Sequence, residues 1–196
     1  MGRGDSILTV AFYRPSETDP PFNRFVAGVS GGVCHVEVAL AADRGSKVAP
    51  DDVTGHTQKM DAYCVYYGEA ITKTTKAYSR EEYGFRSYPV TAEKHDNIVA
   101  YFDDAQKRNV EFSQYAMAAT FLKGLPLWST PQGTCCSILS TEMLQIAGIV
   151  DQSINARRVT PSGLEKILKK LNTSNTETPS NVFHATSNRL QQIRAI

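Results

Sequence analysis

The chain of 196 residues predicts a single α+β domain followed by a short tail. Up to residue 90, apolar and polar residues alternate with a period of two, as in half-buried strands. From residue 91 onward, apolar residues recur with the helical period of about 3.6. Strands first and helices after is the order typical of α+β proteins. We assign the domain to residues 1–171 and a flexible linker and C-terminal tail to 172–196, because 172–187 is rich in Asn, Ser, Thr and Pro.

The strand predictions rest on β-branched and aromatic residues that alternate with polar ones. The clearest strand is VCHVEVALA, in which His35 and Glu37 share one face and Val36 lies on the other. Between the first two strands we expect a loop over 14–24, and the polar stretch 42–59 predicts a longer one. The four predicted strands are 5–13, 33–41, 62–71 and 83–90.

The helix predictions rest on apolar stripes and on signals at the helix ends. In 91–108, acidic residues come early and basic residues late, which suits the helix dipole. Thr160 is placed as an N-cap before Pro161 at the first helical position. Gly148 follows an apolar stripe near the end of another helix. The four predicted helices are 91–108, 111–122, 137–150 and 160–171.

Composition excludes several classes of partner. The 21 basic and 20 acidic residues leave a net charge of +1, which gives no electrostatic reason to expect nucleic acid. No apolar run approaches the ~20 residues of a transmembrane helix, and the N-terminus lacks the pattern of a signal peptide. We therefore expect a cytoplasmic or otherwise intracellular protein with reduced thiols. The four cysteines lack the CxxC spacing of a zinc site, so no metal or other cofactor is predicted.

Two adjacent cysteines precede a helical pattern in PQGTCCSILSTEMLQIAGI, residues 131–149. A helix N-terminus presents partial positive charge and free N–H groups, which stabilise a thiolate and can hold an oxyanion. At ~100° per residue, Cys136 lies closer to the centre of the apolar stripe than Cys135, which favours Cys136 as the nucleophile. The alternative is that both are small buried hydrophobic residues, as most free cysteines are.

A cysteine nucleophile needs a base, and His35 is the best candidate because a mid-strand position is held rigidly. Glu37 projects from the same strand face and could orient the imidazole, as the third residue of a triad does. Asp61, at the start of the next strand, is a rival orienter. The other histidines lie in a polar loop, a charged helical segment and the tail: His56, His95 and His184.

The segment CSILSTEMLQIAGI resembles the nucleophile helix of the NlpC/P60 superfamily. The residues that match its Cys-Ser-x-Leu start and Ala-Gly-Ile ending are Cys136, Ser137, Leu139, Ala147, Gly148 and Ile149. Here the histidine precedes the cysteine by about 100 residues, and this order resembles the circularly permuted branch, which includes lecithin-retinol-acyltransferase-like proteins. The motifs GD at 4–5, CHVEV at 34–38 and CS at 136–137 follow that branch, and other parts are similar to viral and protist members.

This resemblance implies a papain-like fold, circularly permuted, with an antiparallel sheet first and helices after. It implies Cys136 as nucleophile and His35 as general base and acid. The family's third polar residue often comes from the strand after the histidine, so the choice of Glu37 as orienter rests on its shared strand face with His35. We expect backbone N–H groups around Cys136, with Gln132, to hold the oxyanion. The expected activity is that of a thiol hydrolase, a peptidase or amidase that acts on a peptide or amide bond. The alternatives are a lipid acyltransferase or phospholipase of the same fold, and a non-catalytic binding protein or structural component of a virion.

Overall fold

The computed structural model describes residues 6–41, 60–66, 68–76, 82–121 and 133–174. Five strands form one antiparallel sheet in the order β4-β3-β2-β1-β5, so the predicted α+β class is confirmed. The strands are β1 (Ser6–Tyr13), β2 (His35–Ala41), β3 (Met60–Cys64), β4 (Thr72–Lys76) and β5 (Tyr83–Val90). The helices are α1 (Pro21–Ser30), α2 (Ala92–Lys107), α3 (Gln114–Phe121), α4 (Cys136–Ile146), the short 3-10 helix η1 (Ala156–Arg158) and α5 (Pro161–Ser174).

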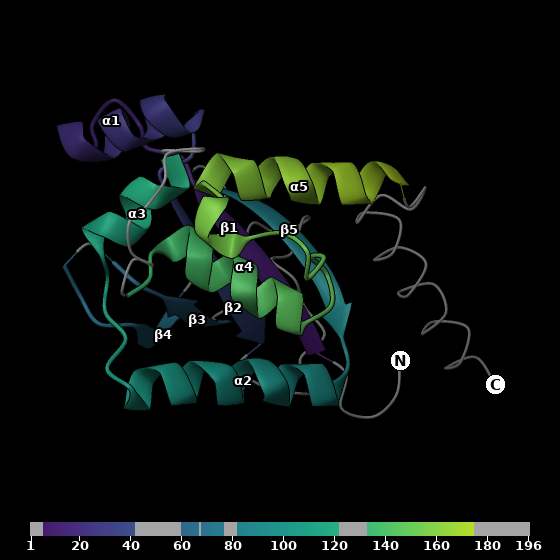
Figure 1. Cartoon of the computed structure of the whole chain (residues 1–196). Helices are drawn as coiled ribbons and strands as arrows, with labels where there is room; N and C mark the ends of the chain where they lie inside the picture. Colours follow the sequence, from purple (N-terminus) through teal and green to yellow (C-terminus); the bar gives the residue numbers. More distant parts are fainter. Residues whose placement is uncertain (1–5, 42–59, 67, 77–81, 122–132, 175–196) are drawn as a thin grey trace.

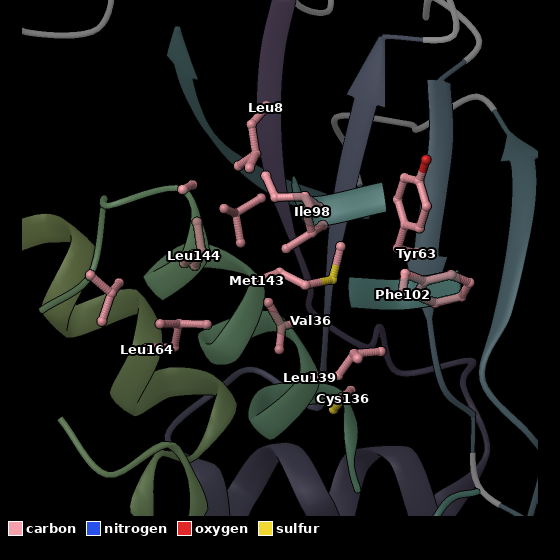
Figure 2. Packing of buried hydrophobic residues seen from close by; sticks show 14 of the residues in the cluster. Leu8, Val36, Tyr63, Ile98, Phe102, Cys136, Leu139, Met143, Leu144 and Leu164 are labelled. Carbon is pink, nitrogen blue, oxygen red and sulfur yellow. The ribbon is translucent and has the colours of Figure 1, made fainter. Parts of the chain in front are cut away.

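Three helices cover one face of the sheet: α4 lies between α2 and α5 (Figure 1). The main hydrophobic core fills the space between this layer and the central strands β1 and β2. Figure 2 shows Leu139 and Met143 of α4 packed over Val36 of β2. On the opposite face of the sheet, a smaller cluster of Ala11, Ala39, Met60 and Ala62 is buried. Strands β1 and β2 therefore bury apolar side chains on both faces, which explains why their sequences are more continuously apolar than a strict alternation.

Helix α1 corrects the prediction of a loop over residues 14–24. The helix begins at Pro21, whose ring restricts φ to a helical value and whose missing N–H needs no partner in the first turn. Apolar residues then recur at helical spacing, and Gly31 ends the helix with a left-handed φ of 82°. Two consecutive prolines suggest a loop, but only the first of them lies outside the helix. The chain therefore does not place all of its strands before its helices, because α1 lies between β1 and β2.

The region after β3 also differs from the prediction. The strand ends at Cys64 rather than continuing to residue 71, and the chain instead forms a separate strand, β4. The sequence of β4, TKTTK, is polar because β4 is an edge strand, which the apolar pattern does not detect.

The remaining helices begin and end close to the predicted positions. The N-cap of α5 is confirmed: Thr160 Oγ1 accepts a hydrogen bond from the backbone N–H of Gly163 at 3.1 Å. After α4, Gly148 has a left-handed φ of 70°. Helix α3 begins at Gln114, three residues later than expected, and α5 extends to Ser174, beyond the predicted domain end. The predicted loop 42–59 and most of the tail lie outside the described residues.

Within the described ranges, no helix is both long and apolar enough to span a membrane.

Two phenylalanines test the assignment of core and surface. Phe102 of α2 is fully buried and meets the Tyr63 ring edge-on at a centroid distance of 4.9 Å. Phe102→Ala is expected to lower the free energy of unfolding by about 3–5 kcal/mol, because it removes a large apolar side chain and leaves a cavity. Phe25→Ala on α1 removes a side chain that is 66% exposed and should change stability by less than about 0.5 kcal/mol. Urea unfolding of both variants measures the difference, and equal effects would contradict the assigned core.

Candidate active site

Cys136 is the first residue of α4, and Cys135 before it is the N-cap with an extended backbone (φ −140°, ψ 171°). The first N–H groups of a helix have no partner within the helix, so they point toward whatever lies at its start. The Cys136 side chain therefore stands where the partial positive charge of α4 is greatest. This is the position that the sequence predicts for a nucleophilic cysteine.

The turn before α4 depends on Gly133. Its φ is 81°, and a Cβ at this position would lie 2.8 Å from the carbonyl oxygen of Glu111. The close approach allows the backbone N–H of Thr134 to donate to that carbonyl at 3.0 Å, and Ser113 N–H to donate to the Thr134 carbonyl at 2.8 Å. These bonds fix the start of α4 against the segment that leads into α3. A side chain at Gly133 would displace the two cysteines.

The adjacent cysteines point to different parts of the core. Cys136 belongs to the main core beside Leu139, at the end of the cluster that faces β2 (Figure 2). Cys135 belongs to a separate small cluster with Ala116, Ile138 and Ala156. Helical geometry predicts that the two side chains point in different directions. Of the two cysteines, Cys136 is the one beside β2, the strand that carries His35.

His35 and Glu37 form a direct ion pair on β2. His35 Nε2 lies 3.0 Å from Glu37 Oε1, and the Glu37 side chain is fully buried. His35 and Glu37 are two residues apart on the strand, and their side chains reach across this separation to make contact. A fully buried carboxylate does not fit an exposed polar strand face.

The His35 imidazole and the Cys136 thiol lie close enough for each to shift the pKa of the other. They meet at the end of the sheet, because His35 is the first residue of β2 and Cys136 the first of α4. Since Nε2 of His35 contacts Glu37, Nδ1 is the nitrogen that remains for the sulfur. Cys136, His35 and Glu37 are thus neighbours at the start of α4 and β2.

The electrostatics of this pair favour a thiolate and an imidazolium. Burial opposes the thiolate of Cys136, but the His35 charge, its hydrogen bond, and backbone N–H donors from Val36 and Ser137 lower the thiol's pKa below the ordinary value. Burial also opposes the imidazolium, but the Cys136 thiolate and then Glu37 raise the pKa of His35 to about 9. Each partner thus stabilises the charged form of the other.

The neighbouring thiols show the opposite behaviour. Burial, followed by the negative charge of Cys136, raises the pKa of Cys135 to about 11. The same two causes raise the pKa of Cys34 to about 12. Of the thiols beside the cleft, Cys136 is therefore the one that ionises most readily.

Tyr66 contacts both polar members of the site, and the sequence analysis does not single it out. Its hydroxyl donates to Glu37 Oε1 at 2.9 Å, and its ring stacks on the His35 imidazole with centroids 5.0 Å apart. Tyr66 follows the end of β3, and nothing in the sequence pattern distinguishes it from the other tyrosines of the chain. The signal that could have found it is the antiparallel register of β2 and β3, which a single sequence does not contain.

The other candidate residues do not join this group. Asp61 is opposite Leu40, five residues along β2 from His35 and so about 16 Å away at ~3.3 Å per residue. Its carboxylate binds Lys73 Nζ at 3.0 Å instead. The imidazole of His95 is buried at the other end of β1 and contacts Ser6 Oγ at 2.8 Å. Three candidates lie outside the described residues: Gln132, His56 and His184.

Cys136 and His35 open into a cleft of about 360 Å³. No Asp, Glu, Lys or Arg is among the described residues that line the cleft. Most of its wall is aromatic or aliphatic, with contributions from Tyr13, Phe22, Val26, Tyr83, Phe112 and Met117. The cleft therefore suits an uncharged group next to the reacting carbonyl.

No group of three or more His, Cys, Asp or Glu side chains in the described part of the chain is arranged to hold a metal ion.

The pKa directions predict how fast each cysteine is alkylated. Because the Cys136 thiol has a lowered pKa, iodoacetamide should label Cys136 at pH 6.5 faster than Cys34, Cys64 or Cys135, by roughly 10-fold or more. His35→Ala removes the positive charge, so burial then raises the Cys136 pKa and labelling at this pH should fall roughly 10- to 100-fold. Mass spectrometry of tryptic peptides across pH 5–9 measures each rate.

His95→Ala is the matched control, because it removes another buried histidine at the far end of β1. Its labelling profile should equal that of the unaltered protein. Labelling of Cys136 only after unfolding, or at the rate of Cys64, would contradict the proposed pair.

No family model, no curated protein and no solved structure matches this chain. The function is therefore inferred from the chemistry of the residues around Cys136.

Proposed function

We propose that the protein is a cysteine-dependent acyl-transfer enzyme, a peptidase or amidase with Cys136 as nucleophile. The observation that carries this proposal is the meeting of Cys136 and His35 at the start of α4, with Glu37 bound to the far side of the imidazole. A buried thiol with a lowered pKa is rare away from reactive sites, since burial alone raises thiol pKa values. The cleft next to this thiol gives a substrate access to it.

The reaction follows from the positions of these groups. The Cys136 thiolate attacks the carbonyl carbon of an amide and forms a tetrahedral oxyanion. His35 Nδ1 then donates its proton to the departing amine, the C–N bond breaks, and an acyl thioester remains on Cys136. The neutral imidazole next takes a proton from water, whose oxygen attacks the thioester. Breakdown of this second tetrahedral oxyanion releases a carboxylic acid and restores the thiolate and the imidazolium.

Backbone N–H groups at the start of α4 are the donors we assign to the oxyanion. The N–H of Cys136 belongs to this first turn. The side chain of Gln132, four residues before Cys136 in the sequence, is proposed as a second donor. Glu37 holds the imidazole and balances its positive charge while the thiolate is consumed.

We further propose that the protein is related to the circularly permuted NlpC/P60 branch and has its papain-like fold. Two features support this relation. The histidine lies on a strand of an antiparallel sheet and the cysteine begins a helix packed on that strand. The histidine strand precedes the cysteine helix in the chain, which is the order of that branch.

A lipid acyltransferase or phospholipase is the second candidate, and the surface of α1 favours it. All of the large hydrophobic side chains that are exposed in the described part lie on this helix: Phe22 at 48%, Phe25 at 66% and Val29 at 56%. They recur at helical spacing and so share one face. Phe22 also lines the cleft, which connects this apolar face with Cys136. An acyl chain could therefore extend from the thiol over α1.

Acylation by 4-nitrophenyl acetate tests the reaction without a natural substrate. The protein should release a burst of nitrophenolate close to one equivalent and gain one acetyl group on Cys136. The burst should disappear in Cys136→Ala. Glu37→Gln should slow the burst at pH 7 by roughly 10²-fold, the lower end of what a correctly positioned general base contributes, because His35 loses the partner that holds it. Stopped-flow absorbance and intact mass measure the two products.

Asp61→Asn is the control for Glu37→Gln, because both remove one carboxylate from neighbouring strands. It should leave the burst unchanged. A burst that persists in Cys136→Ala would exclude the proposed nucleophile, and no acylation of any cysteine would favour a non-catalytic binding or virion structural protein.

The two candidate substrates differ in how acylation depends on chain length. If an acyl chain occupies the cleft, 4-nitrophenyl octanoate should acylate Cys136 at least 10-fold faster than the acetate, the effect of about two buried methylenes at ~0.8 kcal/mol each. Phe22→Ala should reduce the octanoate rate more than the acetate rate. Equal rates for the two esters in the unaltered protein would exclude the lipid candidate and leave the peptidase or amidase in place.

A further inference from the structure

We propose that Tyr66 is a positioning residue of the site: its hydroxyl keeps Glu37 charged and its ring fixes the orientation of His35. This inference rests on the proposed function of Cys136 and His35, and it adds a fourth residue to the proposed Cys136–His35–Glu37 group.

Two contacts place Tyr66 against the site. The Tyr66 hydroxyl and His35 Nε2 approach the same atom, Glu37 Oε1, at 2.9 and 3.0 Å. The tyrosine ring lies nearly parallel to the imidazole, with an interplanar angle of 19° and a centroid distance of 5.0 Å. A residue that only filled space would not need both a directed hydrogen bond and a stacked ring.

Strand register explains how Tyr66 reaches this position. Strands β2 and β3 are antiparallel, with Val38 opposite Tyr63. Extending this register by three residues places Tyr66 opposite His35. The chain has left regular pairing there, since β3 ends at Cys64, but it continues in the same direction past a fully buried Val65. Tyr66 therefore lies just past the end of β3, beside the start of β2.

The hydroxyl matters because Glu37 is fully buried. A carboxylate without water is stable only when donors satisfy its oxygens. His35 supplies one donor, but its charge changes during acyl transfer, whereas Tyr66 stays neutral. Burial and then the charge of Glu37 raise the pKa of Tyr66, so it remains a protonated donor throughout the range in which the cysteine reacts. Tyr66 thus supplies a hydrogen bond whose donor does not change its charge.

The stacked Tyr66 ring holds the orientation of the His35 imidazole. Rotation of the His35 imidazole about its Cβ–Cγ bond would break the parallel stacking and remove Nε2 from Glu37. Both contacts favour the same rotamer, in which Nδ1 is left for Cys136. The ring and the hydroxyl therefore make separable contributions: one to geometry, the other to charge.

Two variants separate these contributions. Tyr66→Phe keeps the ring and removes the hydroxyl, so Glu37 loses a donor and stabilises the imidazolium less. Iodoacetamide labelling of Cys136 should then fall roughly 3- to 10-fold at pH 6 and change little at pH 9, where the thiolate forms without help. Tyr66→Leu also removes the stacking and should reduce 4-nitrophenyl acetate acylation at pH 7 further than Tyr66→Phe does.

Tyr63→Phe is the matched control, because Tyr63 is a buried tyrosine on β3 whose ring faces Phe102 instead of His35. Its pH profile should equal that of the unaltered protein, and thermal melts of all variants show whether they fold. An unchanged profile in Tyr66→Phe would overturn the inference. So would equal losses at pH 6 and pH 9 with a lower melting temperature, since these indicate packing alone.

The result for the unaltered protein distinguishes the two proposals. Selective labelling of Cys136 with no effect of Tyr66→Phe would reject the role of Tyr66 and leave the Cys136–His35 pair in place. The absence of selective labelling in the unaltered protein would reject the pair, and the role of Tyr66 with it.

Discussion

The packing of α4 on β2 is the contact on which the candidate site depends. Leu139 and Met143 bury one side of α4 against Val36 and its neighbours, and this fixes the start of the helix near the start of the strand. Cys136 and His35 are the first residues of these two elements, so their contact is set by the packing of the main core rather than by a loop. A site built between a helix and a strand keeps its geometry because shifting either element would open the core.

Charge is arranged around this contact as a sequence of alternating groups. Cys136 and His35 each favour the charged form of the other, His35 contacts the Glu37 carboxylate, and Glu37 also accepts a hydrogen bond from Tyr66. A buried carboxylate or imidazolium alone would be costly, but each charge here has a partner of opposite sign or a directed donor. The same arrangement explains why three nearby cysteines differ so much: only Cys136 has the imidazolium beside it, and its negative charge raises the thiol pKa of Cys34 and Cys135.

In the proposed reaction, the lining of the cleft determines which groups fit beside Cys136. Its described walls are largely aromatic and aliphatic, so the charged reacting groups lie at the side of a weakly polar space. Such surroundings strengthen electrostatic interactions with a developing oxyanion, because little water competes for them. Helix α1 extends the apolar wall to the surface through Phe22, and the loop interpretation of 14–24 concealed this feature.

The sequence by itself predicted the α+β class, most helices, and the three residues Cys136, His35 and Glu37, because periodicity, helix-start signals and residue chemistry are all local properties. It also favoured Cys136 over Cys135, since the direction of a side chain on a regular helix follows from its position. It did not predict α1, the polar edge strand β4 or the contacts of Tyr66, and it left open whether Glu37 or Asp61 lies against His35. Only the tertiary structure decided these points, because they depend on which strands pair and in what register. That register places Tyr66 beside His35 and Asp61 about 16 Å away, at ~3.3 Å per residue, although both belong to the same stretch of chain.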